Sequence, residues 1–445
     1  MIECQNQLCH PELSEGSIMK NKNLKNWEGT LAVIGVDWGD SGKGRLVDDL
    51  STRAHVVARY NGGANTGHTV KNQAGEFALH IIPSGIFNKN AICLVGRNVA
   101  IDIESLIEEM GALDNAGVSY AKLIIDEQSS LTMPWHKLLD GLREDKRKKG
   151  QKIGTTGKGV GPTYADRTQR IGLLVKDLVS DDFKDKLENE IGFHNKHFGL
   201  GINTEKIFNE YSGFAKRIQK YIGLTVPILK DAHKKGKNIL FEGAQGAFLD
   251  VDFGTYPFIT SSNPGVVGIW RSFDFHPKNI NQVVGITKAY MTRVGEGPMP
   301  TLINDKQSQI IIDKGKEKGT TTGRIRRPGW LDLVLIKEAI EVNGITALAI
   351  TKLDILSYLK LIKICTAYKL NGQKVGYLGH DADYLSKVEP VYKELSGWKK
   401  DITDIRDLNN LPPQAQTFIK FIEKTVNVPV KFISVGPERG EVIYK

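Results

Sequence analysis

Short runs of apolar residues, most of them followed by a glycine-rich or polar loop, constrain the fold of this chain more than any other feature. Runs of this length are typical of buried strands. Strands are predicted at residues 31–34, 56–59, 92–95, 123–125, 238–241, 283–286 and 347–350. Helical periodicity is found at residues 45–50, 103–109, 183–190, 206–221, 226–234, 331–343 and 415–424. Strands alternating with helices favour an α/β fold in which helices flank a large, mostly parallel, twisted central sheet.

The sequence shows no clear linker, internal repeat or low-complexity segment along its 445 residues. Residues 29–445 are therefore predicted to form a single domain, and the polar residues 1–28 a flexible N-terminal tail. No apolar stretch approaches the roughly 20 residues of a membrane span, so no membrane partner is expected. The tail also lacks the apolar segment of a secretory signal. Cysteines are few and have no scaffold-like spacing, which favours a reducing, cytoplasmic location.

The charge balance is basic, with 60 Lys and Arg residues against 51 Asp and Glu residues and a formal net charge of +9. A basic chain suits nucleic acid, acidic membranes or phosphorylated small molecules as partners. We interpret the run Arg143–Lys152 as a solvated helix end rather than as a nucleic-acid site. Other basic residues stand in loops whose composition favours phosphorylated small molecules.

The first of these loops, Gly39–Gly44, reads GDSGKG and joins a predicted strand to a predicted helix. Such a turn offers backbone N–H groups and a helix N-terminus to an anion, and Lys43 adds a positive charge. It departs from a standard P-loop, because Asp37 stands at the first glycine position and Gly44 follows the lysine in place of Ser or Thr. A carboxylate inside a phosphate loop would repel phosphate. Asp40 is therefore predicted to bind a metal or to act as a base.

Further loops carry groups typical of phosphate and carboxylate binding. Asn61–Thr69 (NGGANTGHT) follows a predicted strand, and its His68 is a candidate acid or hydrogen-bond donor. Glycines, hydroxyls and arginines gather again at residues 154–162, 241–246, 254–263 and 319–328. Thr351–Asp354 (TKLD) is similar to the NKxD element with which GTPases read guanine, whose carboxylate accepts the N1–H and 2-amino groups.

In this order, the blocks closely resemble the adenylosuccinate synthetase family. Its signature WGDEGKG is matched by Trp38–Gly44 with one change, and the blocks GGxNxGHT, GTTxxGxGPxY, EGAQGxxLDxDxGTYPxxTSSN, TTGRxRRxGWLD and TKLD also match. The resemblance implies a P-loop-NTPase-like fold with long active-site loops. It also implies a GTP-dependent ligase that joins IMP and L-aspartate into adenylosuccinate, with GDP and phosphate as the other products. The implied route passes through 6-phosphoryl-IMP and is the first committed step of AMP biosynthesis.

The resemblance implies a role for each matching residue. Asp40 is the implied general base toward purine N1 and, with Gly67, a ligand of one Mg²⁺ ion. His68 is the implied general acid in moving the GTP γ-phosphoryl group to purine O6, with Lys43 and Gln245 completing the catalytic set. Arg170 is implied to reach the substrate phosphate of the other subunit of a homodimer. The implied contacts of IMP and aspartate are Asn65, Thr156, Arg170, Gln245, Thr260, Val294, Thr320, Thr321, Thr322 and Arg324. Those of GTP are Gly39, Ser41, Gly42, Lys43, Gly44, Gly67, His68, Thr69, Arg326, Lys352, Leu353, Asp354, Ser434, Val435 and Gly436.

Some positions depart from the family pattern. Ser41 stands where the family usually has Glu, Asp37 replaces a common Gln, and Lys158 and Ile325 each replace an Arg. Phage and archaeal relatives act on dGMP with ATP or GTP to make a 2-amino-deoxyadenylosuccinate. In this alternative, the smaller Ser41 is hypothesised to make room for the 2-amino group. The retained Asp40 and TKLD block favour IMP and GTP.

A second alternative belongs to a different class, namely a regulatory GTPase or a nucleic-acid-binding protein. A switch GTPase needs Ser or Thr after the loop lysine, where this chain has Gly44. A nucleic-acid module needs interleaved aromatic residues and base-reading surfaces, and the sequence shows none. Both are disfavoured, and no nucleic-acid partner is expected.

Overall fold

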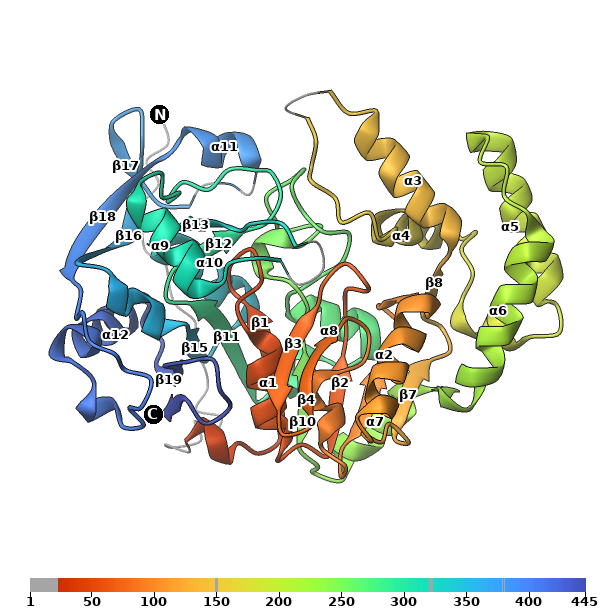
Figure 1. The fold of residues 1–445 in the computed structure, drawn as a ribbon, viewed down its shortest axis with the longest axis horizontal. Helices are drawn as coiled ribbons and strands as arrows, with labels where there is room; N and C mark the ends of the chain where they lie inside the picture. The colour runs from red at the N-terminus through yellow and green to blue at the C-terminus, as the bar shows by residue number, and fades with distance from the viewer. Residues whose placement is uncertain (1–22, 149–150, 320–322, 378, 380) are drawn as a thin grey trace, which may run out of the picture.

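The fold is built on one large twisted sheet, shown in the computed structural model of Figure 1, which describes residues 23–148, 151–319, 323–377, 379 and 381–445. This ten-stranded sheet has the order β20-β19-β15-β11-β1-β10-β2-β5-β7-β9. All neighbouring strands are parallel except β19 and β20. The strands are β1 (Thr30–Gly35), β2 (Val56–Arg59), β5 (Ile92–Val95), β7 (Leu123–Asp126), β9 (Ile222–Gly223), β10 (Ile239–Glu242), β11 (Gln282–Lys288), β15 (Ala347–Thr351), β19 (Val430–Ser434) and β20 (Val442–Tyr444). The predicted strands and the predicted fold class are confirmed.

The central strand β1 shows why the apolar runs could be recognised as strands in the sequence. Its residues are all buried, because helices cover both faces of the sheet. Side chains alternate between the faces, so Ala32 and Ile34 join one hydrophobic core while Leu31 and Val33 join the other. In register, Leu31 lies opposite Leu240 of β10. The carboxyl ends of β1, β2, β10, β11 and β15 therefore face the same edge of the sheet.

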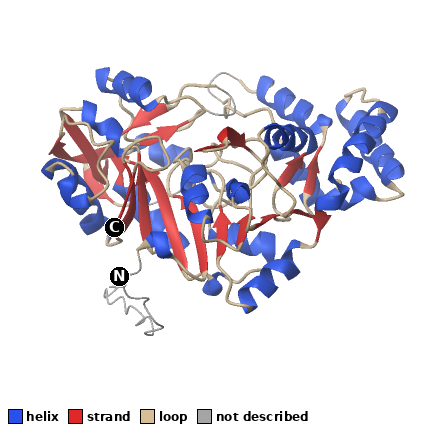
Figure 2. Cartoon of the chain, turned by 60° about the horizontal axis from the view of Figure 1, so that its bottom comes forward, coloured by secondary structure: helices blue, strands red, loops and turns tan. Residues whose placement is uncertain are grey.

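Helices cover both faces of the sheet, as Figure 2 shows. Side chains of α1 (Lys43–Ser51) and α2 (Ile103–Asn115) pack into one core, and those of α8 (Val266–Phe273), α10 (Leu333–Asn343) and α12 (Pro413–Val426) into the other. The helix α7 (Thr225–Lys234) contacts α8 and β10. An arm of four helices lies at one end of the sheet in Figure 1, formed by α3 (Pro134–Asp145), α4 (Val160–Gln169), α5 (Phe183–Phe198) and α6 (Thr204–Ile218).

The sequence did not predict a second sheet, in which β14 (Leu331–Asp332), β16 (Leu361–Leu370), β17 (Gln373–Val375) and β18 (Glu389–Ser396) pair mostly antiparallel. It also did not predict α3, α4, α8, α9 (Lys306–Gly315) or α11 (Ala382–Lys387). Three small strand pairs were missed as well. They join β3 (His68–Asn72) to β4 (Gly75–Leu79), β6 (Ala100–Asp102) to β8 (Ser130–Thr132), and β12 (Met291–Arg293) to β13 (Arg327–Gly329).

The structure shortens the predicted N-terminal tail. Leu24 and Trp27 are buried, and the Trp27 indole N–H donates to the carbonyl oxygen of Leu50 at 3.1 Å. Residues 23–28 are therefore packed against the domain, and the rest of the predicted tail lies outside the described residues. Within the basic run, α3 ends at Asp145 and Lys146–Lys148 are exposed, as expected of a solvated helix end. Among the described residues, no helix combines the length and apolar character needed to cross a membrane.

Candidate active site

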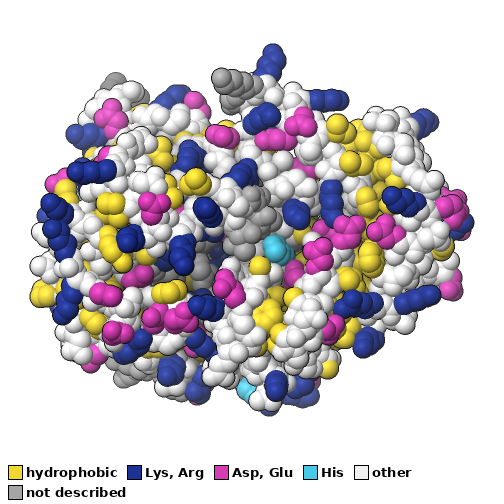
Figure 3. Space-filling view, in the orientation of Figure 1, with side chains coloured by type: hydrophobic (Ala, Val, Ile, Leu, Met, Phe, Trp, Pro, Cys, Tyr) yellow, Lys and Arg dark blue, Asp and Glu magenta, His cyan; other side chains and the backbone are white. Residues whose placement is uncertain are grey.

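Two cavities meet at the carboxyl edge of the central sheet, and Asp40, Thr66 and Gly67 line both of them. Figure 3 shows several Lys and Arg side chains around the middle of this face. Polar residues of the first cavity are Asn65, Asp140, Thr156, Gln245, Thr260, Arg293, Glu296 and Arg324. The second cavity is lined by Lys43, Arg45, His68, Lys314, Arg326, Lys352, Asp354 and Ser434, among others. A molecule in one cavity can therefore react with a molecule in the other across Asp40.

The phosphate-type loop is shaped by its glycines. Gly42 has a φ of 86°, a left-handed conformation that caps α1, and the helix begins at Lys43 with its N–H groups toward the second cavity. Gly44 explains the departure from a standard P-loop, because a Cβ atom there would lie 2.8 Å from Cβ of His68. The missing side chain lets the His68 loop approach the phosphate loop. From β15, Thr351 Oγ1 donates to the carbonyl oxygen of Ser41 at 2.8 Å and holds the turn.

Asp40, Gln245 and Lys352 share an unfavourable backbone conformation. Their φ angles are 56°, 63° and 57°. Left-handed conformations in residues other than glycine cost on the order of 1–3 kcal/mol each and cluster at functional sites. The surrounding contacts must hold these residues in place, and all three belong to the set predicted from the sequence.

A buried ionic network supports Asp40. Arg326 Nε donates to Asp40 Oδ2 at 2.8 Å, and its NH1 group donates to Glu317 Oε2 at 2.9 Å. The same Glu317 accepts from Lys288 Nζ at 2.7 Å and from Lys352 Nζ at 3.1 Å. Burial raises the pKa of Glu317, but the three cations outweigh it and hold that pKa far below its usual range. Glu317 therefore stays ionised and fixes Arg326 against Asp40.

Lys43 lies under the junction of the cavities. It is only 3 % exposed, and its Nζ donates to the carbonyl oxygen of Gln245. Burial lowers the pKa of Lys43, while the nearby carboxylates of Asp37 and Asp40 raise it. A buried ammonium with so few hydrogen-bond acceptors is suited to an anionic ligand such as phosphate.

His68 is oriented by a carboxylate. Its Nδ1 atom bonds to Glu242 Oε1 at the end of β10, and Ser84 donates to both Glu242 oxygens, at 2.6 Å and 2.8 Å. Burial lowers the pKa of His68 to about 4, more than Glu242 raises it. The neutral imidazole thus donates from Nδ1, which leaves Nε2 unprotonated. Nε2 is buried and has no hydrogen-bond partner among the described residues.

The first cavity is held together by hydrogen bonds between loops. Gln245 Nε2 donates to Thr260 Oγ1 at 2.9 Å, and Asn65 Nδ2 lies 3.4 Å from the same hydroxyl. Across the cavity, Arg324 NH2 donates to the carbonyl oxygen of Gly154 at 2.9 Å. Loops from distant parts of the sequence therefore enclose a polar space.

The far end of the second cavity is closed by the C-terminal loop. Arg45, on α1, donates to Ser434 Oγ at 2.5 Å and to the carbonyl oxygens of Gly436, Glu438 and Glu441. Asp354, at the start of the 3-10 helix after β15, lines this end. Burial raises its pKa to about 6, although Lys352 and Arg45 lower it. A ligand that donates hydrogen bonds to this carboxylate would favour its ionised form.

Most residues predicted from the sequence are brought together here. Those at the first cavity are Gly39, Asp40, Asn65, Gly67, Thr156, Gln245, Thr260, Val294 and Arg324. Those at the second are Asp40, Ser41, Gly42, Lys43, Gly44, Gly67, His68, Thr69, Arg326, Lys352, Asp354, Ser434 and Gly436. Leu353 and Val435 are fully buried, and neither they nor the exposed Arg170 line a cavity. Thr320, Thr321 and Thr322 lie outside the described residues.

Ser41 lies on the second cavity's side, is fully buried, and donates from Oγ to Asp37 at 2.8 Å. The hypothesis that the smaller Ser41 makes room for a 2-amino group stays a prediction.

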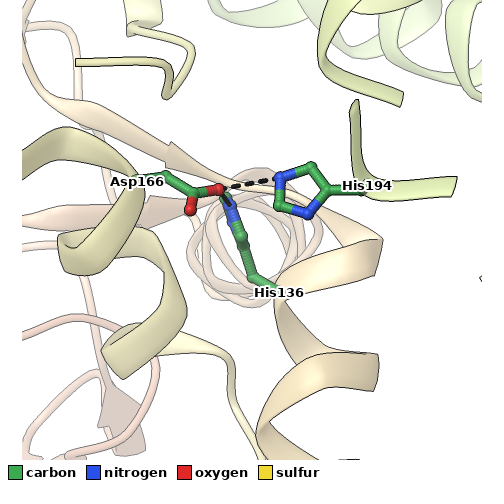
Figure 4. Close-up of side chains that lie close together, drawn as sticks. All are labelled: His136, Asp166 and His194. Carbon is green, nitrogen blue, oxygen red and sulfur yellow. Dashed lines mark hydrogen bonds and ion pairs between the residues drawn. The ribbon is translucent and has the colours of Figure 1, made fainter. Parts of the chain in front are cut away.

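His136, Asp166 and His194 form a separate buried cluster (Figure 4) and line neither cavity. Both Nε2 atoms lie close to Asp166 Oδ2, at 2.8 Å and 3.0 Å. His136 Nδ1 accepts the N–H of Met133 at 2.9 Å, so its proton sits on Nε2, the atom that would have to bind a metal. Metal-binding histidines have the opposite arrangement, with the other nitrogen donating. The cluster is therefore an ion-pair network that joins α3, α4 and α5.

The residues that would bind Mg²⁺ are not those of the His136 cluster. Asp40 and Gly67 line both cavities, and the Asp40 side chain is 28 % exposed. Carboxylate and carbonyl oxygens are the hard ligands that Mg²⁺ prefers, usually with substrate phosphates completing the shell. These residues therefore fit the ion.

The sequence reasoning missed several residues of the site, notably Glu242, Lys288, Glu317 and Arg45. Glu242 lies in the FEGAQG block and directly follows the predicted strand at residues 238–241, which was a usable signal. Lys288 likewise ends β11. Glu317 has no such signal, since it follows no predicted strand and its lysine partners are 29 and 35 residues away in the sequence.

Comparisons with known proteins agree with this geometry. The family model described as adenylosuccinate synthetase matches residues 32–443. The adenylosuccinate synthetase of Heliobacterium modesticaldum is 43% identical over 420 residues, which cover 93% of this chain and 98% of the relative. That of Halothermothrix orenii is 44% identical over 421 residues, with coverage of 93% and 98%.

Two solved structures were compared as well. Fully ligated adenylosuccinate synthetase from Plasmodium falciparum has a TM-score of 0.90 and 35% identity, covering 94% of this chain and 100% of that one. The succinoaminodeoxyadenylate synthetase of cyanophage S-2L, bound to dGMP and dATP, shares the fold with a TM-score of 0.62 but only 17% identity, with coverage of 94% and 95%. On the match of the family model and the identity to its curated members over nearly its whole length, this chain belongs to the adenylosuccinate synthetase family.

Proposed function

We propose that the two cavities hold the two nucleotides of the family reaction, GTP in the second and IMP in the first, and that the reaction occurs where they meet. The observation that carries the proposal is the position of Asp40, which lines both cavities beside the phosphate loop. The γ-phosphoryl group of GTP would move to O6 of IMP. The amine of L-aspartate would then displace the phosphate at C6 to give adenylosuccinate.

Asp40 is the proposed general base for the purine N1 proton. Removing that proton pushes electron density toward O6, which becomes a better nucleophile for the phosphoryl group. Arg326 holds the carboxylate through the bond at 2.8 Å and is itself held by Glu317. Gln245 and Thr260 offer an amide and a hydroxyl to the purine, and Asn65, Thr156 and Val294 line the same cavity.

His68 is the proposed acid beside the transferring group. The Nε2 atom, buried and without a partner among the described residues, belongs to a side chain of the second cavity. An anionic phosphoryl group next to it would favour the imidazolium, with Glu242 stabilising the charge from the other side. The ring could then donate a hydrogen bond or a proton to a phosphoryl oxygen.

Lys43 and the first N–H groups of α1 are proposed to bind the β- and γ-phosphates, and Asp40 with the Gly67 carbonyl to hold one Mg²⁺. When bound, the ion neutralises charge on the phosphates. At the far end, Asp354 would accept hydrogen bonds from guanine, which selects GTP over ATP. Lys352, Ser434 and Gly436 would contact the base and ribose.

Aspartate is proposed to bind beside Gly319 and Arg324, where Arg324 reaches across the first cavity to Gly154. The guanidinium is suited to a carboxylate of the amino acid or to the ribose. Thr320–Thr322 belong to the same proposed site.

A homodimer is part of the proposal. Arg170 ends α4 in a left-handed conformation and is exposed, so it does not reach a cavity of its own chain. Leu138 and Leu142 are 50 % and 43 % exposed on the neighbouring α3, and Figure 3 shows hydrophobic side chains on this part of the surface. A second copy packed here would bring Arg170 to the substrate phosphate of its partner. Arg170→Ala is then expected to raise KM for IMP at least tenfold with little effect on KM for GTP, and an unchanged KM for IMP would contradict this role.

The proposal also treats the described residues as one catalytic domain and places the enzyme in the cytoplasm. Its substrates are nucleotides, and the described cysteines Cys93 and Cys365 are free and buried. A reducing compartment suits both observations.

The test compares IMP with dGMP as acceptor in the presence of aspartate, GTP and Mg²⁺, and measures the succinylated product. IMP is expected to turn over faster, and faster turnover of dGMP would overturn the substrate assignment. Asp40→Ala and His68→Ala are each expected to lose roughly 10²–10⁴-fold in kcat with an unchanged fold by circular dichroism. Near-wild-type turnover in either variant would remove that residue from the proposed chemistry.

A further inference from the structure

The two positions at which the phosphate loop departs from its family lie next to each other in space. In the family pattern that the sequence resembles, a Gln commonly stands at the position of Asp37 and a Glu at that of Ser41. In the structure, Ser41 Oγ donates to Asp37 Oδ1 at 2.8 Å, and both side chains are buried. Departures that touch are more informative than isolated ones, because each can compensate for the other.

The surroundings of Asp37 suit a carboxylate. Oδ1 accepts the backbone N–H of Gly39 at 2.8 Å in addition to the Ser41 hydroxyl. Oδ2 accepts from Thr287 Oγ1 at 3.1 Å. Three donors thus face the two oxygens, and two of them belong to the phosphate loop itself. Asp37 therefore ties the loop to itself and to the end of β11.

Asp37 is also the main counter-charge of Lys43. Burial lowers the pKa of Lys43, and Asp37 offsets this more than Asp40 does. Asp40 has its own partner in Arg326 and faces both cavities. Asp37 is only 1 % exposed and therefore has no comparable contact with a ligand. Burial raises the pKa of Asp37 in turn, and the charge of Lys43 lowers it, so the carboxylate and the ammonium group each favour the charged form of the other.

We propose that Asp37 and Ser41 are a linked exchange, in which the carboxylate that the family loop carries at position 41 is carried here at position 37. Asp37 is the positioning residue that holds the loop and balances Lys43, and Ser41 supplies the hydrogen bond that the exchange requires. The proposal rests on the proposed function of Lys43 in phosphate binding. It predicts that the loop needs one buried carboxylate at this place. A loop with no carboxylate here, or with two, is predicted to be impaired.

The exchange is expected to leave the first cavity unaffected. Neither Asp37 nor Ser41 lines the first cavity, so moving the carboxylate between them leaves the purine contacts as they are. The exchange therefore belongs to GTP binding and phosphoryl transfer, and not to the choice between IMP and dGMP.

The test is a double-mutant cycle with Asp37→Asn, Ser41→Asp and the combined variant. Asp37→Asn keeps the shape and removes the charge, so kcat/KM for GTP is expected to fall at least 30-fold. Ser41→Asp places a second carboxylate against the first. Its kcat/KM for GTP is therefore expected to fall at least as far, and its Tm is expected to be lower. The combined variant restores one carboxylate with a donor opposite, and its kcat/KM is expected to return to within fivefold of the wild-type value.

Two results would overturn the proposal. One is a combined variant whose kcat/KM equals the product of the two single losses, since that shows independent positions. The other is wild-type kcat/KM for GTP in Asp37→Asn. Ser41→Asp alone could unfold, so Tm is also measured for every variant of the cycle. The Tm of the combined variant must be higher than that of Ser41→Asp. Ser41→Ala serves as the matched control, which removes the hydrogen bond without changing charge and is expected to lower kcat/KM less than tenfold.

Lys43→Ala separates this proposal from the proposed function on which it rests. If Lys43 binds phosphate, GTP binding measured by calorimetry falls at least 30-fold in this variant. Unchanged GTP binding would remove the role of Lys43, while the coupling of Asp37 and Ser41 in Tm would stand. Loss of GTP binding in Lys43→Ala together with independent effects at positions 37 and 41 would remove only the exchange.

Discussion

The two cavities are built on opposite principles. Behind the second cavity stand buried charges, namely Lys43, Glu317, Lys288 and the His68–Glu242 pair. The first cavity is lined by half-buried groups such as Asn65, Thr156 and Thr260, and the Thr260 hydroxyl accepts hydrogen bonds from Asn65 and Gln245 on other loops. Charges fixed before a ligand arrives need little reorganisation when phosphoryl charge develops. The second cavity, the proposed phosphoryl side, is therefore preorganised by the fold, whereas the first cavity, the proposed purine side, depends on loops that meet across a space.

Glu317 provides the strongest test of this contrast. Glu317→Gln leaves Lys288, Lys352 and Arg326 without their shared carboxylate in a buried place. We expect a loss of about 3–5 kcal/mol in the free energy of unfolding, measured by urea denaturation, and a fall in kcat because Arg326 no longer holds Asp40. The matched control is Glu296→Gln, an exposed carboxylate of the first cavity, with an expected change below about 0.5 kcal/mol. Equal stability of the two variants would contradict the proposed difference between the two cavities.

The cluster of His136, Asp166 and His194 tests whether buried charge by itself marks a site. Although burial opposes it, the contacts of His194 with Asp166 and Glu190 raise its pKa to about 9. A raised pKa stabilises the fold below the unfolded value of about 6.5, and this contribution is lost as the pH rises through about 9. We expect the free energy of unfolding to fall by on the order of 1–3 kcal/mol between pH 6.5 and pH 9.

In His194→Gln this loss of stability should largely disappear, while kcat at pH 7 stays near the wild-type value, because the cluster lines neither cavity. His197→Gln, on the exposed side of the same helix, is the control and should keep the wild-type pH profile. A large loss of kcat in His194→Gln would tie the cluster to the reaction after all.

The smallest effect is expected in the first cavity. Thr260→Val keeps the shape and removes the hydroxyl that Gln245 contacts at 2.9 Å. The loss of one such hydrogen bond is worth about 1 kcal/mol. KM for IMP should therefore rise about fivefold, with Tm and KM for GTP nearly unchanged. A loss of stability comparable to that of Glu317→Gln would show that the first cavity is as rigid as the second.

The same contrast explains what the sequence could predict. Seven of the ten strands of the central sheet were predicted correctly, since strands buried on both faces, such as β1, read as unbroken apolar runs. The other three, β9, β19 and β20, were missed. The loops after them were predicted as the site because their glycines and polar groups follow the strand ends. The arm helix α3 was missed, and its exposed Leu138 and Leu142 blur the amphipathic pattern. Strands β16 and β18 were missed because their burial is irregular and a bulge interrupts their register.

Within the site, the residues proposed to contact ligands were easier to recognise in the sequence than those that support them. Asp40, Lys43 and His68 stand in glycine-rich motifs, whose composition reveals them. Glu317 supports Asp40 through Arg326 and also binds Lys288 and Lys352, which lie far from it in the sequence, so only the folded chain shows these contacts. Asp37 was visible as a departure from the family pattern, but its partner Ser41 became meaningful only through their hydrogen bond.

The attachment of the loop between Glu317 and Arg326 has a consequence for how such an enzyme can evolve. The Arg326 side chain bonds to Glu317, its N–H donates to the Glu317 carbonyl oxygen at 3.0 Å, and Lys318 and Ile325 form a bridge just beyond. Both ends of the loop are thus fixed to one carboxylate, which also secures Asp40 through Arg326. On the proposed function, substitutions between these ends, such as Ile325 in place of an Arg, would change how aspartate is captured while Asp40 keeps its position. Selection on the proposed aspartate site would then be separated from selection on the proposed phosphoryl chemistry.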